Sequence, residues 1–267
     1  MNRIAETFTR LKEQGRKGLI LYVSAGDPTL AFTENLVPAL AAAGADIVEL
    51  GLPFSDPLAD GPVIQAASQR ALAAGASAKG VLALAARIRK KSDLPLALMT
   101  YYNPVFRYGE ARFVHDAAAA AIDALIVPDL PLEESSSLRE SCRRAGLGYV
   151  TFVAPTSTPE RIASAAAAAT AFIYGVTVTG VTGMRRELPE EALRMAAAVK
   201  DAASTPLALG FGISGPAQAK AVATAADAVI VGSALVSLVA EQVKFSEEAA
   251  LEAAQEFVRD LRQALDS

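Results

Sequence analysis

Residues 19–50 read LILYVSAGDPTLAFTENLVPALAAAGADIVEL, and this stretch decides the fold. An apolar run at 19–24 is followed by an Ala-rich run at 30–43 and by a second apolar run at 46–50. Near-continuous apolar runs are typical of parallel strands that are buried on both faces. The stretch therefore predicts a strand, a helix and a second strand parallel to the first.

The same alternation continues along the chain. It predicts eight strands, at 19–24, 46–50, 96–100, 124–127, 149–153, 171–176, 207–209 and 228–231. The helical runs lie at 30–43, 78–90, 109–120, 133–145, 159–168, 189–203, 216–224 and 247–264. Eight strand–helix pairs in about 250 residues indicate a (β/α)8 TIM barrel.

We expect a single α/β barrel domain over residues 1–267, with an extra N-terminal helix and extra short helices in the loops after the second and eighth strands. A doubly wound open sheet is the structural alternative, but it often carries a G-x-G-x-x-G first turn. The first turn here, SAGDP at 24–28, lacks that spacing. Pro and Gly residues mark strand–helix junctions, so no linker divides the chain.

Composition excludes several classes of function. The chain has 267 residues, a formal charge of −4, one Cys (Cys142) and one His (His115). These values argue against nucleic-acid binding, a disulfide framework and a multi-histidine metal site. The N-terminus has no apolar secretory segment, and the uncharged stretch at 162–184 is mostly Ala, Thr and Gly. We expect a protein of the cytoplasm, with no membrane span.

The loop after the second strand carries the strongest candidates for chemistry. Glu49 interrupts an apolar strand at its C-terminal end, where barrel active sites gather. A buried, hydrogen-bonded structural glutamate is the alternative. Asp60 precedes Gly-Pro, and Asp56 precedes Pro57. For both aspartates a turn or helix-cap role is the alternative to a functional one.

Glycines follow the seventh and eighth strands, in LGFGISGP at 209–216 and VGSAL at 231–235. Glycine lets the backbone approach an anion closely, and a helix N-terminus supplies N–H donors. Barrels frequently bind phosphate at these two loops. The pair predicts a phosphate site, with ordinary turns and caps as the alternative.

Other segments leave two interpretations open. The loop at 178–187 is either a mobile lid or a surface loop without a role. Tyr22 and Tyr174 are core aromatics or ligand contacts, and 101–104 is a turn or a contact surface. Every lysine lies away from the C-terminal ends of the predicted strands, and His115 lies in a predicted helix. Acid/base catalysis by carboxylates on a phosphorylated substrate is what remains.

Residues 49–62, with the pattern ELGxPFSDPxADGP, resemble the signature of the tryptophan synthase alpha subunit. Further segments resemble that family in the same order: GDP at 26–28, YNP at 102–104, VPDLP at 127–131, GVTG at 180–183, GFGIS at 210–214 and GSA at 232–234. The resemblance spans nearly the whole chain, and the 49–62 motif is long and highly specific.

The resemblance implies a lyase that cleaves indole-3-glycerol phosphate to indole and glyceraldehyde 3-phosphate without a cofactor. Glu49 would be the principal acid/base, and Asp60 would interact with the indole N–H. Further residues would bind the substrate: Gly183, Gly212, Gly232 and Ser233 at the phosphate, Tyr22, Met99, Ile126 and Phe211 around the indole, Tyr174 beside Glu49, and Thr182 closing a lid over Asp60.

The resemblance also implies a partner, a PLP-dependent beta subunit that consumes the indole, in a tetramer of two alpha and two beta chains. Pro53, Asp56, Asn103 and Pro131 would lie at that contact, with simple turn chemistry as the alternative. One local departure is Gly175 and Val178-Thr179 before the GVTG segment, where many members carry bulky apolar and Arg or Asn residues. This departure bears on the lid rather than on the reaction.

Three alternatives to this interpretation stay open. A stand-alone lyase that releases indole would use identical chemistry. A non-catalytic barrel that only activates a partner is disfavoured because both Glu49 and Asp60 are present. A sugar-phosphate epimerase usually needs metal ligands that a single histidine does not supply.

Overall fold

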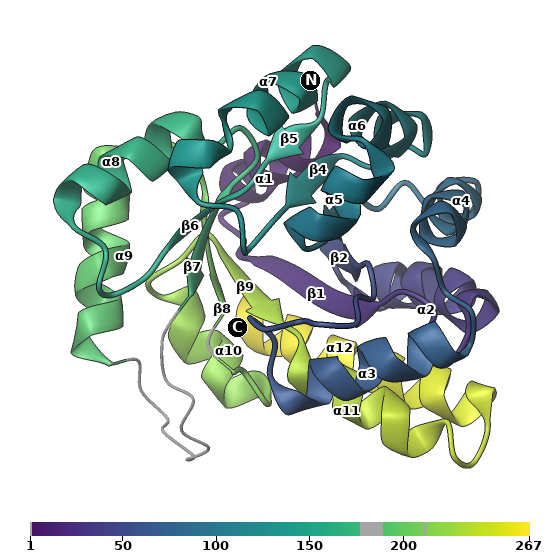
Figure 1. Ribbon diagram of the computed structural model, residues 1–267. Coiled ribbons are helices and arrows are strands. Elements are labelled where there is room, and N and C mark those ends of the chain that lie inside the picture. The colour runs from purple at the N-terminus through teal and green to yellow at the C-terminus, as the bar shows by residue number, and fades with distance from the viewer. Residues whose placement is uncertain (1, 177–188, 211) are drawn as a thin grey trace.

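The strands form one parallel sheet that curls into a nearly closed barrel (Figure 1). The computed structural model describes residues 2–176, 189–210 and 212–267. Within them the sheet has nine strands in the order β5-β4-β3-β2-β1-β9-β8-β7-β6. The strands are β1 (Gly18–Ser24), β2 (Ile47–Gly51), β3 (Leu96–Met99), β4 (Ala124–Ile126), β5 (Gly148–Tyr149), β6 (Thr151–Val153), β7 (Ile173–Val176), β8 (Leu207–Gly210) and β9 (Ala228–Val231).

The barrel prediction is confirmed, with one correction at the expected fifth strand, 149–153. The chain changes partner at Val150, because β5 pairs with β4 whereas β6 pairs with β7. The Val150 N–H still donates to the Leu125 carbonyl at 3.1 Å. The two edge strands of the sheet are therefore consecutive in the chain, and Val150 joins them.

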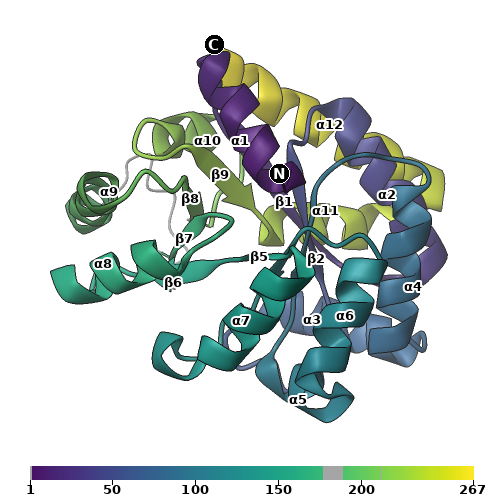
Figure 2. The ribbon, with the colours of Figure 1, turned by 90° about the horizontal axis from the view of Figure 1, so that it is seen from above.

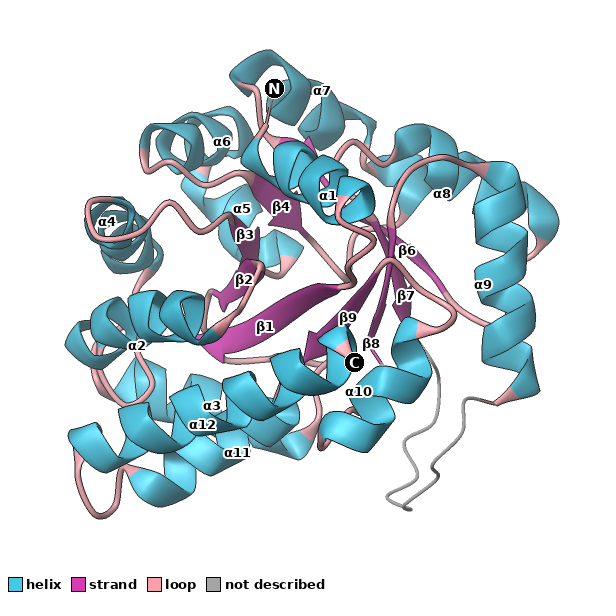
Figure 3. Cartoon of the chain, turned by 180° about the vertical axis from the view of Figure 1, so that it is seen from behind, coloured by secondary structure: helices cyan, strands magenta, loops and turns pink. Residues whose placement is uncertain are grey.

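Helices surround the sheet, as Figure 3 shows from behind. They are α1 (Arg3–Glu13), α2 (Leu30–Ala43), α3 (Pro62–Ala73), α4 (Ala78–Arg89), α5 (Tyr102–Tyr108), α6 (Glu110–Ala119), η1 (Leu132–Glu134), α7 (Ser136–Ala145), α8 (Pro159–Ala168), α9 (Glu190–Ala202), α10 (Pro216–Ala223), α11 (Ser233–Gln242) and α12 (Glu247–Asp266). The expected extra helices are present as α1, α3 and α11. Helix α5 was not expected; Pro104 is compatible with it because the first helical turn leaves its N–H groups unpaired.

Side chains alternate between an outer and an inner core. Leu19 and Leu21 face outward and pack in the cluster that the surrounding helices share. Ile20 faces inward and packs with Phe172 and with Phe8 of α1. Figure 2 shows α1 lying across the strands, at the end of the barrel where they begin. Helix α1 therefore closes this end.

A repeated hydrogen-bond pair ties the strand starts together at the closed end. Asp46, Asp123 and Asp227 lie directly before β2, β4 and β9, and Thr170 lies three residues before β7. The side chain of each accepts the N–H of one residue of the neighbouring strand, and its backbone N–H donates to the carbonyl of that strand residue. The side-chain bonds run from Leu19 to Asp46 (2.9 Å), from Leu96 to Asp123 (2.9 Å), from Tyr149 to Thr170 (2.8 Å) and from Leu207 to Asp227 (2.8 Å). This pattern recurs at every second strand once β5 and β6 are taken together.

Among the described residues, no single helix is long and apolar enough to cross a membrane. Helices α3 and α4 meet the length and composition criteria only together, and they are bent by 96° at the break between them.

Candidate active site

Glu49 points into the barrel at the open end. Ile47 belongs to the inner core, and strand side chains alternate between the two faces, so Glu49 faces inward one step nearer the C-terminal end of β2. The carboxylate is fully buried, and neither oxygen has a hydrogen-bond partner. This burial raises the pKa of Glu49 to about 8. The group therefore holds a proton at neutral pH.

Two tyrosine rings flank this carboxylate, and two strand glycines make room for them. Tyr22 on β1 is the cross-strand partner of Glu49, and a Cβ on Gly51 would lie 2.2 Å from the Tyr22 hydroxyl. Similarly, a Cβ on Gly210 would lie 2.9 Å from the Tyr174 hydroxyl. Burial and then the Glu49 charge raise the pKa of Tyr174 well above its ordinary value. The two uncharged rings therefore form the wall of the pocket next to Glu49.

Asp60 reaches the same pocket from the loop between β2 and α3. Its N–H donates to the Pro57 carbonyl at 3.0 Å, and Gln65 Nε2 donates to the Asp60 carbonyl at 3.0 Å. The carboxylate is half-buried. Burial raises the pKa of Asp60, and a hydrogen bond from Tyr101 opposes that rise. The backbone of Asp60 is thus fixed on both sides while its side chain faces the pocket.

The open-end pocket has a volume of about 540 Å³, in the range of small-ligand sites. Both Glu49 and Asp60 line it. Its other described lining residues are Tyr22, Ala59, Gly61, Ile64, Met99, Tyr174, Val176, Gly210, Gly212, Ile213, Ser214, Ile230, Gly232, Ser233, Ala234 and Ser237. The structure thus brings the two predicted carboxylates and the two glycine loops to one cavity.

One side of the pocket is suited to an anion. Helix α11 begins at Ser233, and its N-cap Gly232 has no side chain to satisfy the first N–H groups. Gly212 has a φ of 58°, a left-handed conformation that favours glycine. Ser214 donates both its N–H and its hydroxyl to Gln218 Oε1, at 2.7 and 2.8 Å. The described lining includes no lysine or arginine, so backbone and hydroxyl donors are the groups available to a phosphate.

The other predicted substrate contacts fall in three groups. Met99 lines the pocket, whereas Ile126, its cross-strand partner, lies in the inner core and not among the lining residues. Thr182, Gly183, Phe211 and the Val178-Thr179 departure lie outside the described residues. At Gly175 a Cβ would lie 2.3 Å from Leu209 Cδ2. Leu209 therefore fills the space that a bulkier residue at 175 would need.

The predicted partner contacts share one rim of the barrel. They occupy the loops and helix starts that follow β2, β3 and β4. Asp56, Asn103 and Pro131 are exposed, whereas Pro53 is buried. Leu58 is 92% exposed on the same rim. The arrangement is compatible with a protein contact, which remains a prediction.

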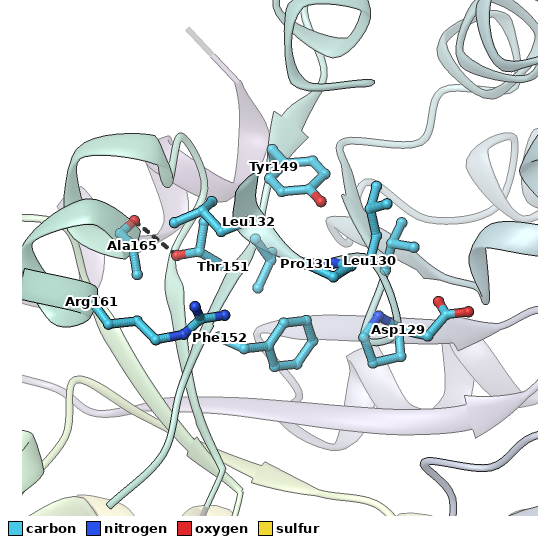
Figure 4. Close-up of a pocket in the computed structure, with 12 residues that line it drawn as sticks. Asp129, Leu130, Pro131, Leu132, Tyr149, Thr151, Phe152, Arg161 and Ala165 are labelled. Carbon is cyan, nitrogen blue, oxygen red and sulfur yellow. Dashed lines mark hydrogen bonds between the residues drawn. The ribbon is translucent and has the colours of Figure 1, made fainter. Parts of the chain in front are cut away.

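Figure 4 shows a second pocket of about 240 Å³, beside the point where β5 and β6 change partners. Pro131 and Phe152 line it, and Thr151 Oγ1 donates to the Ala165 carbonyl at 3.0 Å. Arg161 lines it too, but its Nη1 is paired with the Glu133 carboxylate at 2.7 Å. Neither Glu49 nor Asp60 belongs to this pocket, so the candidate chemistry lies in the larger one.

One residue that sequence reasoning did not assign to the site is Tyr101, which contacts the loop before Asp60 without being among the described lining residues of the larger pocket. Its hydroxyl accepts the Ala59 N–H at 3.0 Å and its ring packs 5.4 Å from that of Phe54. The available signal was a tyrosine almost directly after the third strand, at the barrel mouth. Ile64 was also missed; it gave no distinct signal, since apolar helix positions are common. Ser214 belongs to the predicted phosphate loop at 209–216, but it was not named as a contact.

Within the described residues, no three His, Cys, Asp or Glu side chains gather as a metal-binding group. His115 is exposed on α6. Cys142 is buried on α7, and burial raises the pKa of its thiol to about 12.

Comparison with known proteins extends the resemblance. The family model for the tryptophan synthase alpha chain matches residues 8–266. The tryptophan synthase alpha chain of Citrifermentans bemidjiense is 51% identical over 236 residues, 88% of each chain. That of Caldanaerobacter subterraneus is 46% identical over 265 residues, 99% of this chain and 100% of that protein.

Solved structures agree with these sequence matches. The tryptophan synthase subunit alpha of Legionella pneumophila superposes with a TM-score of 0.92 at 36% identity, covering 100% of this chain and 99% of that one. A chain from aminoacrylate-bound tryptophan synthase of M. tuberculosis gives a TM-score of 0.88 at 32% identity, covering 99% and 100%. The chain therefore belongs to the family of tryptophan synthase alpha chains, carbon–carbon lyases of tryptophan biosynthesis.

Proposed function

We propose that this chain cleaves indole-3-glycerol phosphate to indole and glyceraldehyde 3-phosphate, with Glu49 as the acid/base and Asp60 as the partner of the indole N–H. The observation that carries the proposal is the fully buried, unpaired Glu49 carboxylate facing a pocket that Asp60 and two glycine loops also line. Cofactor chemistry has no part in it. Family membership supports the reaction class.

Glu49 would move both protons. With a pKa of about 8 it is protonated at neutral pH and can donate to C3 of the indole. That proton turns C3 tetrahedral and leaves positive charge on the ring nitrogen. The Glu49 carboxylate then removes the hydroxyl proton of the adjacent glycerol carbon. The C–C bond breaks, its electrons return to the indole ring, and an aldehyde leaves, so the carboxyl group is restored.

Asp60 would stabilise the charge that develops between these two steps. A carboxylate beside the ring N–H lowers the energy of the protonated indole, and a half-buried site strengthens this interaction relative to water. The two acids would thus divide their roles: the fully buried Glu49 exchanges protons, and Asp60 acts as the carboxylate beside the ring N–H.

The pocket's two sides match the two ends of the substrate. Gly212, Gly232 and Ser233, with Gly183, would bind the phosphate through backbone and hydroxyl donors. Tyr22 and Met99, with Ile126 and Phe211, would surround the indole. Tyr174 would lie at the glycerol chain beside Glu49, and Thr182 would close over Asp60.

We further propose that the chain works in the cytoplasm with a tryptophan synthase beta chain, as two alpha and two beta chains, and that PLP belongs only to the beta chain. The structures from M. tuberculosis tryptophan synthase support such a partner. The contact would use the rim that carries Asp56, Asn103 and Pro131, with Pro53 shaping its loop.

A cleavage assay with purified protein, alone and with a beta chain, tests the proposal. Glu49→Gln should lower kcat by about a thousand-fold or more, because proton transfer is lost while phosphate binding stays. Asp60→Asn should lower kcat by about a hundred-fold. Wild-type turnover by Glu49→Gln would refute the mechanism. Cleavage that a beta chain neither binds nor stimulates would favour a stand-alone lyase, and activation of a beta chain without cleavage would favour a non-catalytic barrel.

A further inference from the structure

Tyr101 connects the loop after β2 with the start of α5. It is the N-cap residue of α5 and is only 6% exposed. Its hydroxyl oxygen accepts the Ala59 N–H at 3.0 Å, 42 residues away in sequence. Its ring lies 5.4 Å from the Phe54 ring, at the other end of the same loop. One side chain therefore contacts the loop at its beginning and immediately before Asp60.

The backbone around Tyr101 is itself held in place. On its N-terminal side, the Thr100 N–H donates to the Ile126 carbonyl of β4 at 2.9 Å. On its C-terminal side, the Tyr102 N–H donates to Asp129 Oδ1 at 2.8 Å. Both bonds reach the neighbouring strand or its loop, so the Tyr101 hydroxyl is presented from a fixed part of the barrel.

We propose that Tyr101 is a positioning residue that holds Asp60 in the geometry the reaction needs, by accepting the Ala59 N–H and donating its own hydroxyl proton to the Asp60 carboxylate. A hydroxyl can form both bonds at once, because it carries one proton and two lone pairs. This inference rests on the proposed function, since it assigns to Asp60 the role given above. Tyr101 itself acts only through Asp60.

The charges around Asp60 agree with this arrangement. Burial raises the pKa of Asp60, and the Tyr101 hydrogen bond lowers it again. Burial and then the Asp60 charge raise the pKa of Tyr101, so the phenol keeps its proton. The other titratable groups facing Asp60 are Tyr22 and Tyr174, and Glu49 is the other carboxyl group on the pocket. The Tyr101 bond thus favours the ionised form of Asp60 and opposes the effect of burial.

A kinetic experiment on the full chain tests whether Tyr101 acts through Asp60. Tyr101→Phe should lower kcat about 10- to 100-fold with little change in KM, as expected for a lost hydrogen bond to a charged group. Tyr108→Phe is the matched control, because its hydroxyl donates to Asp116 at 2.7 Å from the same helix. The double variant Tyr101→Phe/Asp60→Asn should be no slower than Asp60→Asn alone. Wild-type kcat in Tyr101→Phe, or multiplicative losses in the double variant, would overturn the proposal.

A titration that needs no turnover separates this inference from the proposed function. The Asp60 carboxyl carbon, followed by NMR in protein labelled with 13C-aspartate, should titrate at higher pH in Tyr101→Phe and at the wild-type pH in Tyr108→Phe. An unchanged Asp60 titration in Tyr101→Phe would overturn the positioning role even if cleavage is confirmed. A shifted titration in a chain that cleaves no substrate would leave the contact standing and refute the proposed function.

Discussion

The two ends of the barrel treat buried carboxylates in opposite ways. At the closed end, Asp123 accepts bonds from Arg3, from Arg89 and from the Leu96 N–H. At the open end, Glu49 is buried as deeply and accepts none. A buried polar group without partners destabilises the fold by a few kcal/mol. The contrast therefore separates carboxylates that stabilise the barrel from one whose burial opposes folding, as expected for the catalytic role proposed for Glu49.

The largest effect is expected for Glu49, whose unpaired carboxylate should make the free energy of unfolding depend on pH. Its pKa is about 8 in the fold and close to 4.5 in the unfolded chain. Between these values the folded state binds one more proton, so the free energy of unfolding falls as pH rises, by at most about 1.4 kcal/mol per pH unit and about 5 kcal/mol in all. This penalty is absent below pH 4.5 and complete above pH 8. Urea unfolding should show that Glu49→Gln lacks it.

The control for that measurement is Glu252→Gln, an exposed position on α12. It should unfold like the wild type at every pH. If Glu49→Gln gains no stability over the wild type at pH 8, the carboxylate has partners in solution, and the contrast between the two ends is lost.

Whereas Glu49→Gln at the open end should stabilise the fold, Asp123→Asn at the closed end should destabilise it. The substitution removes the charge that pairs with Arg89, whose side chain is only 12% exposed, and leaves that guanidinium without its carboxylate. We expect the free energy of unfolding to fall by about 3 kcal/mol. The kcat per folded molecule should stay at the wild-type value.

Urea unfolding and active-site-normalised kinetics measure both effects of Asp123→Asn. Asp260→Asn, exposed on α12, is the control and should change neither quantity. A large fall in kcat without loss of stability would show that the closed end takes part in catalysis and would break the division.

Sequence periodicity was sufficient to predict the open end of the barrel. Strand side chains alternate, so Glu49 has to point to one of two buried faces, and its place near the C-terminal end of the apolar run 46–50 puts it at the pocket. The two glycine loops could be predicted equally well, because glycine is the residue type that lets the backbone approach a ligand closely. The pairing of Tyr22 with Gly51 could not be predicted, since it depends on which ring crosses which strand.

Tertiary contacts between residues far apart in the sequence could not be predicted. The change of partner at Val150 depends on where β4 and β7 end, and nothing in the apolar run 149–153 marks it. For Tyr101 a turn and a contact surface both stayed open, because its bond to Ala59 spans 42 residues and no local pattern marks it. The closed-end aspartates did carry a signal, an acid directly before Ile47, Ala124 and Ala228, but a helix or turn explains such residues equally well until strand neighbours are known.

The smallest effect is expected at Asp227. Like Asp123, it accepts an N–H at the start of a neighbouring strand, a contact we call the strand cap, but within the described residues it lacks the two arginine bonds of Asp123. Its carboxylate accepts the Leu207 N–H at 2.8 Å, and Leu207 is buried. Asp227→Ala should lower the free energy of unfolding by about 1 kcal/mol, because the N–H loses its acceptor while half-buried surroundings leave room for water. Asp227→Asn keeps an acceptor oxygen and should unfold close to the wild type. Equal losses of stability in both variants would show that the charge of Asp227, rather than its acceptor oxygen, stabilises the strand start. A fall in kcat per folded molecule in either variant would show that the closed end influences the active site at the open end.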